Sequence, residues 1–183
     1  MATLKDQIIS SAELTFDTHG FTASGIDGLA NAAGVSTRTL YRHVGSKTLL
    51  MAAVLEGRAA RFFNALPIES VDAVFEGLTT WIVNEGSRGC LFLRAQGESG
   101  GTDSNVAAAV ASYRTRLRAL IRHVVAEELG RDDKKVADQL LVLIEGATSA
   151  SAYVGPGAVE EARYVASVVM AQALSASGVE REA

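Results

Sequence analysis

The fold is decided at residues 24–47, which read SGIDGLANAAGVSTRTLYRHVGSK. Ser24 and Asp27 have the spacing of a capping box, which predicts the start of a helix at this point. Gly34 can take the left-handed conformation that ends such a helix in a sharp turn. Ser36 then supplies the N-cap of a second helix. The stretch is therefore predicted to be a helix-turn-helix.

The second helix of this motif has one apolar and one basic face. At about 100° per residue, Leu40 and Val44 point one way and Arg38 and Arg42 point nearly opposite. Residues 34–47 contain three Lys or Arg and one His, and no Asp or Glu. An exposed arginine on a helix in the major groove is well shaped to bind guanine by two hydrogen bonds. The residues expected at base edges are Thr37, Arg38 and Arg42.

Composition agrees with a helical protein that carries one small basic surface. The chain has 183 residues, of which 48% are hydrophobic and only 6% aromatic, and its net charge is −4. This charge argues against binding nucleic acid over the whole surface. Apolar residues recur at three- and four-residue spacing nearly throughout, and no window alternates as a half-buried strand does. We expect an all-α protein of about nine helices.

The expected helices follow this periodicity and the helix-breaking residues. They are one from Leu4 that ends at Gly20, the two of the motif, and six at about 46–65, 68–85, 90–96, 104–129, 134–153 and 159–174. The first would brace the motif into a three-helix DNA-binding head. The last two are apolar around much of their circumference, which indicates that a second copy of the chain covers them. We expect a homodimer through these two helices.

The chain shows no sign of secretion or of a membrane span. Cys90 is its single cysteine, so no disulfide can form within the chain. The first twenty residues carry Asp6, Glu13 and Asp17 where a signal peptide has a basic start and an apolar run. The most apolar segment, 140–144 with its flanks, is too short to cross a bilayer. A cytoplasmic protein without a membrane partner is expected.

The motif and its flanks resemble the TetR family of bacterial transcriptional regulators over residues 4–55. The resemblance rests on Phe16, Gly20-Phe21, Leu29-Ala30, Ala33-Gly34-Val35-Ser36, Thr39-Leu40-Tyr41-Arg42-His43, Gly45-Ser46-Lys47 and Leu49-Leu50. Three positions depart from the usual pattern: Val44 replaces an aromatic, Ser24 a threonine and Thr48 an acid. None of these changes removes a phosphate-binding group.

The resemblance implies a DNA-binding domain at 1–47 and a ligand-binding and dimerisation domain at 48–183. Such a protein would be a repressor that binds a palindromic operator in double-stranded DNA as a dimer and is released by a small apolar effector. The resemblance assigns Tyr41, His43 and Lys47 mainly to phosphates, and amide hydrogens near Ser46 and Ser24 would help. Tyr41 could instead pack in the core, and His43 could cap its helix. The expected DNA-binding set is Ser24, Ser36, Thr37, Arg38, Tyr41, Arg42, His43 and Lys47.

The resemblance also implies a small-molecule pocket enclosed by the fourth to eighth helices. The bulky groups available to line it are Phe62, Phe63, Trp81, Cys90, Phe92, Tyr113 and Tyr153, and the candidate polar anchors are Arg94, Gln96, Arg116 and Glu145. Each bulky group could equally be core packing, and Cys90 could be a buried structural thiol.

Two other functions remain open from the residues alone. One is a DNA-binding dimer that holds no ligand. The other is a helical-bundle enzyme, for which the three histidines supply no paired Glu-x-x-His element and the chain supplies no phosphate loop or nucleophile elbow. No catalytic residue, metal or cofactor is expected.

Overall fold

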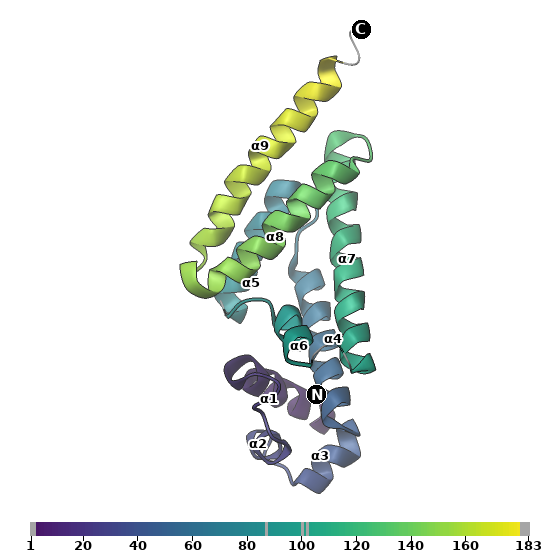
Figure 1. The fold of residues 1–183 in the computed structure, drawn as a ribbon, viewed down its shortest axis with the longest axis vertical. Helices are drawn as coiled ribbons and strands as arrows, with labels where there is room; N and C mark the ends of the chain where they lie inside the picture. The colour runs from purple at the N-terminus through teal and green to yellow at the C-terminus, as the bar shows by residue number, and fades with distance from the viewer. Residues whose placement is uncertain (1–2, 87, 100, 102, 180–183) are drawn as a thin grey trace. The chain divides into compact units, whose positions relative to one another are not determined.

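The protein is all helical in the part of the chain described by the structure, a computed structural model, which covers residues 3–86, 88–99, 101 and 103–179. The helices, labelled in Figure 1, are α1 (Leu4–His19), α2 (Ile26–Ala32), α3 (Thr37–Val44), α4 (Lys47–Ala65), α5 (Val71–Glu85), α6 (Leu91–Ser99), α7 (Ser104–Leu129), α8 (Lys134–Val154) and α9 (Gly157–Val179). The all-α prediction is therefore confirmed, as is the order of its elements.

The helices divide between two compact units. The head unit comprises residues 1–61 and 91–113, and the body unit comprises residues 62–90 and 114–183. Each unit thus draws on two separate stretches of the chain. Two helices, α4 and α7, begin in the head unit and end in the body unit.

Local chemistry explains where several helices begin and end. α1 begins with a complete capping box between Thr3 and Asp6 and ends at Gly20, whose φ of 86° only glycine adopts readily. α5 begins three residues later than predicted, because the Ser70 hydroxyl accepts from the amide of Ala73 at 3.1 Å and caps the helix there. α6 and α9 run beyond their predicted ends, to Ser99 and Val179.

The core of the head unit joins α1, α2, α3 and α4. Its fully buried side chains include Ile8, Phe16, Phe21, Leu29, Leu40 and Leu50, each at most 1% exposed. The rings of Phe16 and Phe21 stack with centroids 4.7 Å apart. Burying a side chain of this size stabilises the fold by about 1.5–3 kcal/mol. This core holds α3 by one face and leaves the other free.

The body unit is built on α5, α8, α9 and the later part of α7. Its core includes Val71, Phe75, Leu78, Ile121, Leu140 and Ile144. At Gly77 of α5 an added Cβ would lie 2.4 Å from Cδ of Pro67, so only glycine fits this contact. Within the described residues, no helix is long and apolar enough to cross a membrane.

Candidate nucleic-acid interface

The turn between α2 and α3 has the conformation that the sequence predicts. Gly34 has a φ of 68°, in the left-handed region. The amide of Val35 donates to the carbonyl of Ala30 at 3.0 Å, which closes the end of α2. The chain therefore reverses within a few residues and α3 starts at a fixed angle to α2.

The start of α3 is capped by Ser36, as predicted. The Ser36 hydroxyl accepts from the amide of Thr39 at 3.1 Å and donates to the Thr39 hydroxyl at 3.0 Å. These two bonds engage the side chain of Ser36. A phosphate at this position would therefore be bound by the free amide hydrogens of the first turn of α3.

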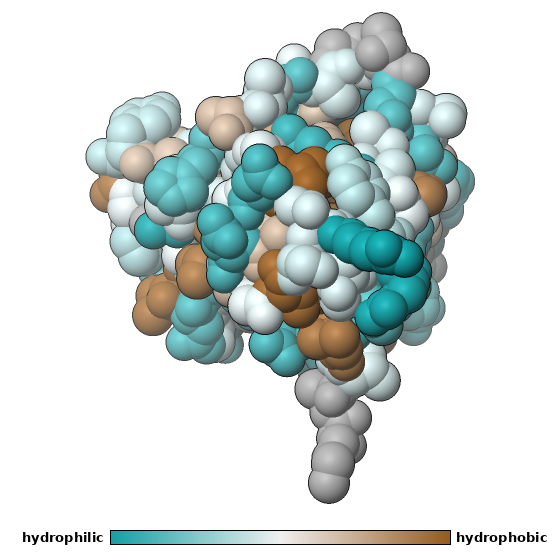
Figure 2. Space-filling view, turned by 90° about the horizontal axis from the view of Figure 1, so that it is seen from below, coloured by the Kyte–Doolittle hydropathy of each residue, from teal (hydrophilic) through white to brown (hydrophobic). Residues whose placement is uncertain are grey.

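The two faces of α3 are as predicted. Leu40 is fully buried and Val44 is 8% exposed, while Arg38 and Arg42 are exposed. Tyr41 is 46% exposed, so its ring is not core packing. Thr37 and His43 are half-buried at the edges of this exposed face. Figure 2 looks at the molecule from the end where Figure 1 labels α2 and α3, and hydrophilic side chains gather there with smaller hydrophobic patches between them.

Arg38 and Arg42 differ from most arginines of the chain in having no acidic partner within the described residues. Arg118 pairs with Asp138 at 3.0 Å, and Arg122 pairs with Asp132. Further ion pairs hold Arg58, Arg94, Arg131 and Arg163. An unpaired guanidinium on an acid-free surface keeps all five donors available for base edges or phosphates.

The N-terminus of α4 adds a second anion-binding element beside α3. The amide of Leu49 donates to the Ser46 hydroxyl at 3.1 Å, and that hydroxyl bonds with the hydroxyl of Thr48 at 3.1 Å. The Lys47 ammonium donates to the carbonyl of Thr22 at 3.4 Å. A helix N-terminus with a lysine in its first turn is suited to a phosphate.

The capping box predicted at Ser24 and Asp27 is wrong. The N-cap of α2 is Gly25, without a side-chain cap. The Ser24 hydroxyl donates instead to the carbonyl of Gly20 at 2.6 Å, and the residue is 5% exposed. The carbonyl at the end of α1 competes successfully for the hydroxyl, which spacing alone could not reveal. The side chain of Ser24 is therefore not offered to DNA.

Four of the candidate ligand residues form one aromatic cluster in the body unit. The rings of Phe62 and Phe63 have centroids 5.3 Å apart, and those of Phe62 and Trp81 5.2 Å, both edge to face. The Arg116 guanidinium lies 4.2 Å from the centre of the Phe63 ring. This arrangement provides an apolar wall with one cation against it.

The remaining ligand candidates lie at separate places. In the head unit the rings of Phe92 and Tyr113 stack in parallel, 3.7 Å apart, and Gln96 is exposed. Cys90 is a buried cysteine of the body unit. Glu145 is half-buried on α8, and this burial raises the pKa of its carboxyl, although the charge of Arg114 acts the other way.

Arg94 has a structural role that the sequence did not predict. Its guanidinium donates to the Asp17 carbonyl at 3.0 Å, to the Asp17 carboxylate at 3.3 Å and to the Phe16 carbonyl at 3.3 Å. A guanidinium on the last carbonyls of α1 stabilises the end of that helix. The donors of Arg94 are thus engaged within the head unit.

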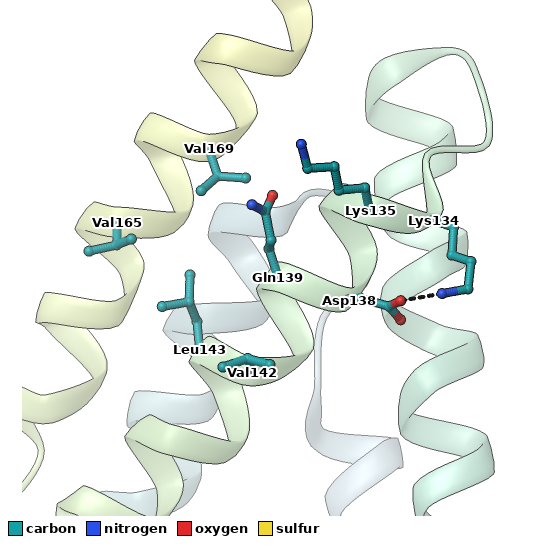
Figure 3. A pocket seen from close by; sticks show the side chains of 8 residues that line it. All are labelled: Lys134, Lys135, Asp138, Gln139, Val142, Leu143, Val165 and Val169. Atoms are coloured by element: carbon teal, nitrogen blue, oxygen red, sulfur yellow. Dashed lines mark hydrogen bonds and ion pairs between the residues drawn. The ribbon is translucent and has the colours of Figure 1, made fainter.

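An open groove of about 770 Å³ runs between α8 and α9 in the body unit (Figure 3). Val142, Leu143, Val165 and Val169 form its apolar walls, and Lys134, Lys135, Asp138 and Gln139 lie around one end. Val142 is 70% exposed. An apolar surface of this kind is typical of a protein contact.

The fold and the basic face of α3 define a helix-turn-helix DNA-binding protein. Residues 8–54 match the family of bacterial regulatory proteins called the tetR family. A putative TetR transcriptional regulator from Streptomyces avermitilis has a similar structure, with 26% identity, a TM-score of 0.75 and coverage of 96% of this chain and 98% of that chain. A TetR-family transcriptional regulator from Streptomyces coelicolor also has a similar structure, with 24% identity, a TM-score of 0.85 and coverage of 93% of this chain and 96% of that chain. No curated protein sequence matches the chain.

These likenesses extend to a TetR transcription regulator from the archaeon Haloarcula marismortui, with 18% identity, a TM-score of 0.78 and coverage of 92% of this chain and 97% of that chain. The chain thus resembles DNA-binding transcriptional regulators of the TetR family, in its helix-turn-helix by sequence and along most of its length by fold.

Proposed function

We propose that the protein is a repressor that binds a palindromic operator as a homodimer and is released by a small apolar effector. The observation that carries this proposal is the pair Arg38 and Arg42, exposed and without acidic partners on a helix whose opposite face is buried through Leu40 and Val44. Two copies of α3, one from each subunit, would enter successive major grooves. Twofold symmetry of the protein then requires twofold symmetry of the operator.

Base reading and phosphate binding fall to different residues in this proposal. Arg42 and Arg38 bind base edges together with Thr37, since a guanidinium can bind guanine by two hydrogen bonds. Tyr41, His43 and Lys47 bind phosphates, as do the amides that follow Ser36 and Ser46. Phosphate contacts set affinity and register, whereas base contacts set sequence preference.

The dimer forms through α8 and α9. The exposed apolar residues of these helices and the groove between them support this proposal: Val142, Tyr153, Val154, Tyr164, Val165, Val168 and Leu174 are each at least 40% exposed in the single chain. A second copy that inserts side chains into the groove would remove this surface from water, which is the main driving force of such association.

The effector is a small, mainly apolar molecule that contacts residues of the domain 48–183. The aromatic cluster of Phe62, Phe63 and Trp81, with Arg116 beside it, supports this assignment in the body unit. Cys90 and Glu145 of the body unit are further candidates, and Phe92 and Tyr113 of the head unit are separate candidates. An effector releases DNA only if it binds better to the form of the dimer that binds DNA less well. Residues 1–47 then act as the DNA-binding domain, and the protein works in the cytoplasm, where its operator is accessible.

The decisive experiment is protection of an inverted repeat by the purified protein in the DNA that flanks its own coding region. Arg42→Ala should relax the base preference at one position of each half-site, and Lys47→Gln should weaken all sequences about equally. Arg118→Ala removes the same charge from a residue paired with Asp138 and should change neither. Equal loss of affinity in Arg42→Ala and Arg118→Ala would show that only the net charge of the protein matters for DNA binding. This result would contradict the proposal that α3 contacts the bases.

The effector is tested separately by thermal stabilisation against a library of small hydrophobic compounds. Compounds that raise the melting temperature should weaken operator binding, and Trp81→Ala should abolish both effects. If stabilising compounds leave operator affinity unchanged, the protein is a DNA-binding dimer without this form of control.

A further inference from the structure

Two charged side chains of α6 hold the connection between α1 and α2. Arg94 donates to the last carbonyls of α1, as described above. Glu98, four residues later on the same face of α6, accepts from the amide of Thr22 with its carboxylate at 2.8 Å. The Thr22 hydroxyl also donates to the backbone carbonyl of Glu98 at 3.3 Å. All these residues belong to the head unit.

The backbone makes room for this contact at Gly20. A Cβ at that position would lie 3.0 Å from both carboxylate oxygens of Glu98, which is closer than real Cβ contacts normally are. Gly20 is therefore needed for two reasons, its φ of 86° and the approach of this carboxylate. The absence of a Cβ at Gly20 thus leaves room for the Glu98 carboxylate beside the end of α1.

Thr22 links this contact to the DNA-binding surface. Glu98 holds Thr22 by its amide and by its hydroxyl, so the direction of the Thr22 carbonyl is restricted. That carbonyl is the acceptor for the ammonium of Lys47, at 3.4 Å. An ammonium has three donors, so Lys47 can keep this bond and still donate two hydrogens to a phosphate.

We propose that Glu98 is a positioning residue for DNA binding, which acts through Thr22 to hold the ammonium of Lys47 where the phosphate will lie. The proposal rests on the proposed function, because it takes Lys47 as a phosphate contact. A flexible lysine side chain loses conformational freedom when it binds, and a carbonyl that already orients it reduces this loss. Glu98 thereby favours the binding of DNA through Lys47, although its own negative charge repels the DNA phosphates.

Removal of Glu98 should therefore change the affinity for DNA in opposite directions, depending on whether its charge or its positioning of Lys47 matters more. Operator affinity is measured over a range of salt concentrations for the full-length protein and for Glu98→Ala. Loss of a negative charge alone would tighten binding to DNA, whereas loss of the positioned lysine should weaken it by about two- to fivefold, the range for an exposed charged contact. Glu98→Gln, which keeps an acceptor for the Thr22 amide, should recover part of the loss. Glu56→Ala removes an exposed acid from α4 and is the matched charge control.

A double-mutant cycle separates positioning from a general structural role. Lys47→Gln should weaken binding and lower the slope of log affinity against log salt by about 0.9, as expected for one lost phosphate contact. Glu98→Ala should shift this slope toward that of Lys47→Gln and should no longer weaken binding in the Lys47→Gln background. If Glu98→Ala weakens binding equally in both backgrounds, or tightens it as a bare charge change would, the proposal is wrong.

The cycle also distinguishes this proposal from the proposed function. If Lys47→Gln leaves the affinity and the salt slope unchanged, Lys47 does not contact a phosphate and Glu98 has no positioning role. The proposed contact of Arg42 with base edges is still tested separately, by the base preference of Arg42→Ala. Melting temperatures of the four proteins within about 2 °C of each other, a shift below about 1 kcal/mol for a chain of this size, show that the comparison concerns folded protein.

Discussion

Glu13 of α1 and Arg58 of α4 form an ion pair that is almost completely withdrawn from water. The Arg58 guanidinium donates to Oε1 of Glu13 at 3.0 Å, and the two side chains are 7% and 11% exposed respectively. Arg61 reaches the same oxygen at 2.6 Å from a more exposed position. Two guanidinium groups from α4 thus balance one carboxylate from α1. This pair ties α1 to α4, the helix that follows α3.

Removing Glu13 should be among the most damaging single changes in the head unit. Glu13→Ala removes a buried carboxylate that binds the buried guanidinium of Arg58, which we expect to lower the free energy of unfolding by about 3–5 kcal/mol. Chemical denaturation at neutral pH measures this change. Replacing both partners by apolar residues, Glu13→Leu with Arg58→Met, should recover much of the loss, since both buried charges of this pair are then removed. A double variant as unstable as Glu13→Ala would show that packing around the pair matters more than its charge.

Two glycines of the helix-turn-helix should respond in opposite ways to alanine. Gly28 lies in the middle of α2, and an added Cβ would have no atom within 4 Å. Gly28→Ala should therefore stabilise the protein by about 1 kcal/mol through helix propensity. Gly34 has equally open surroundings but a φ of 68°, so Gly34→Ala should destabilise it by about 1–2 kcal/mol. Thermal unfolding of the two variants measures both effects, and a gain from Gly34→Ala would contradict the left-handed turn.

The contact between Asp72 of α5 and Arg163 of α9 should make stability depend on pH. Arg163 donates to both carboxylate oxygens of Asp72 at 2.6 Å, and these hydrogen bonds lower the pKa of Asp72 below its ordinary value. The contribution of Asp72 to the free energy of unfolding is therefore present above the pKa of the carboxyl in the unfolded chain. It is lost as the pH falls through the lower pKa that the carboxyl has in the folded protein.

Asp72→Asn should lower the melting temperature at pH 7 by up to about 3 °C, as expected for a mostly exposed ion pair. The difference from the unsubstituted protein should shrink in strongly acidic buffer. Asp27→Asn, a change at an exposed acid of α2, is the control. A difference that persists unchanged at acid pH would mean that Asp72 acts through packing and not through its charge.

Glu145 should have the opposite pH dependence. Burial raises the pKa of its carboxyl, so the folded protein resists its ionisation and the charged form costs stability above that pKa. Glu145→Gln should therefore raise the melting temperature at pH 7, and the gain should vanish once the pH falls below the ordinary pKa of a glutamate. Lower stability of the glutamine variant at neutral pH would indicate that the carboxylate has a favourable partner.

The groove of Figure 3 makes a prediction about assembly. Val142→Glu places a charge in an apolar wall that the proposed dimer would bury, so the variant should be monomeric in sedimentation analysis and bind the operator more weakly. Val83→Glu changes a valine of α5 that is 63% exposed and should leave the dimer intact. A dimeric Val142→Glu protein would exclude this face as the interface.

Much of the fold could be predicted because helix periodicity and helix ends depend on nearby residues. The reading helix followed from the spacing of Leu40 and Val44 and from the cap at Ser36, and the structure confirms both. The capping box at Ser24 was wrong because a hydroxyl can donate as well as accept, and that of Ser24 donates to the carbonyl of Gly20 and does not cap α2. The late start of α5 likewise reflects a cap, at Ser70, that the apolar pattern did not reveal.

What the sequence by itself determined is the helical chain, the sharp turn at Gly34 and the outward direction of two arginines on α3. These features follow from backbone sterics and from a repeat of 3.6 residues, which act over one or two helical turns. Only the tertiary structure decided that Glu13 meets Arg58, that Arg94 meets Asp17 and that Glu98 meets Thr22, across 45, 77 and 76 residues. Contacts over such separations depend on how whole helices pack, and a chain with many acids and bases offers each charge several partners before it folds.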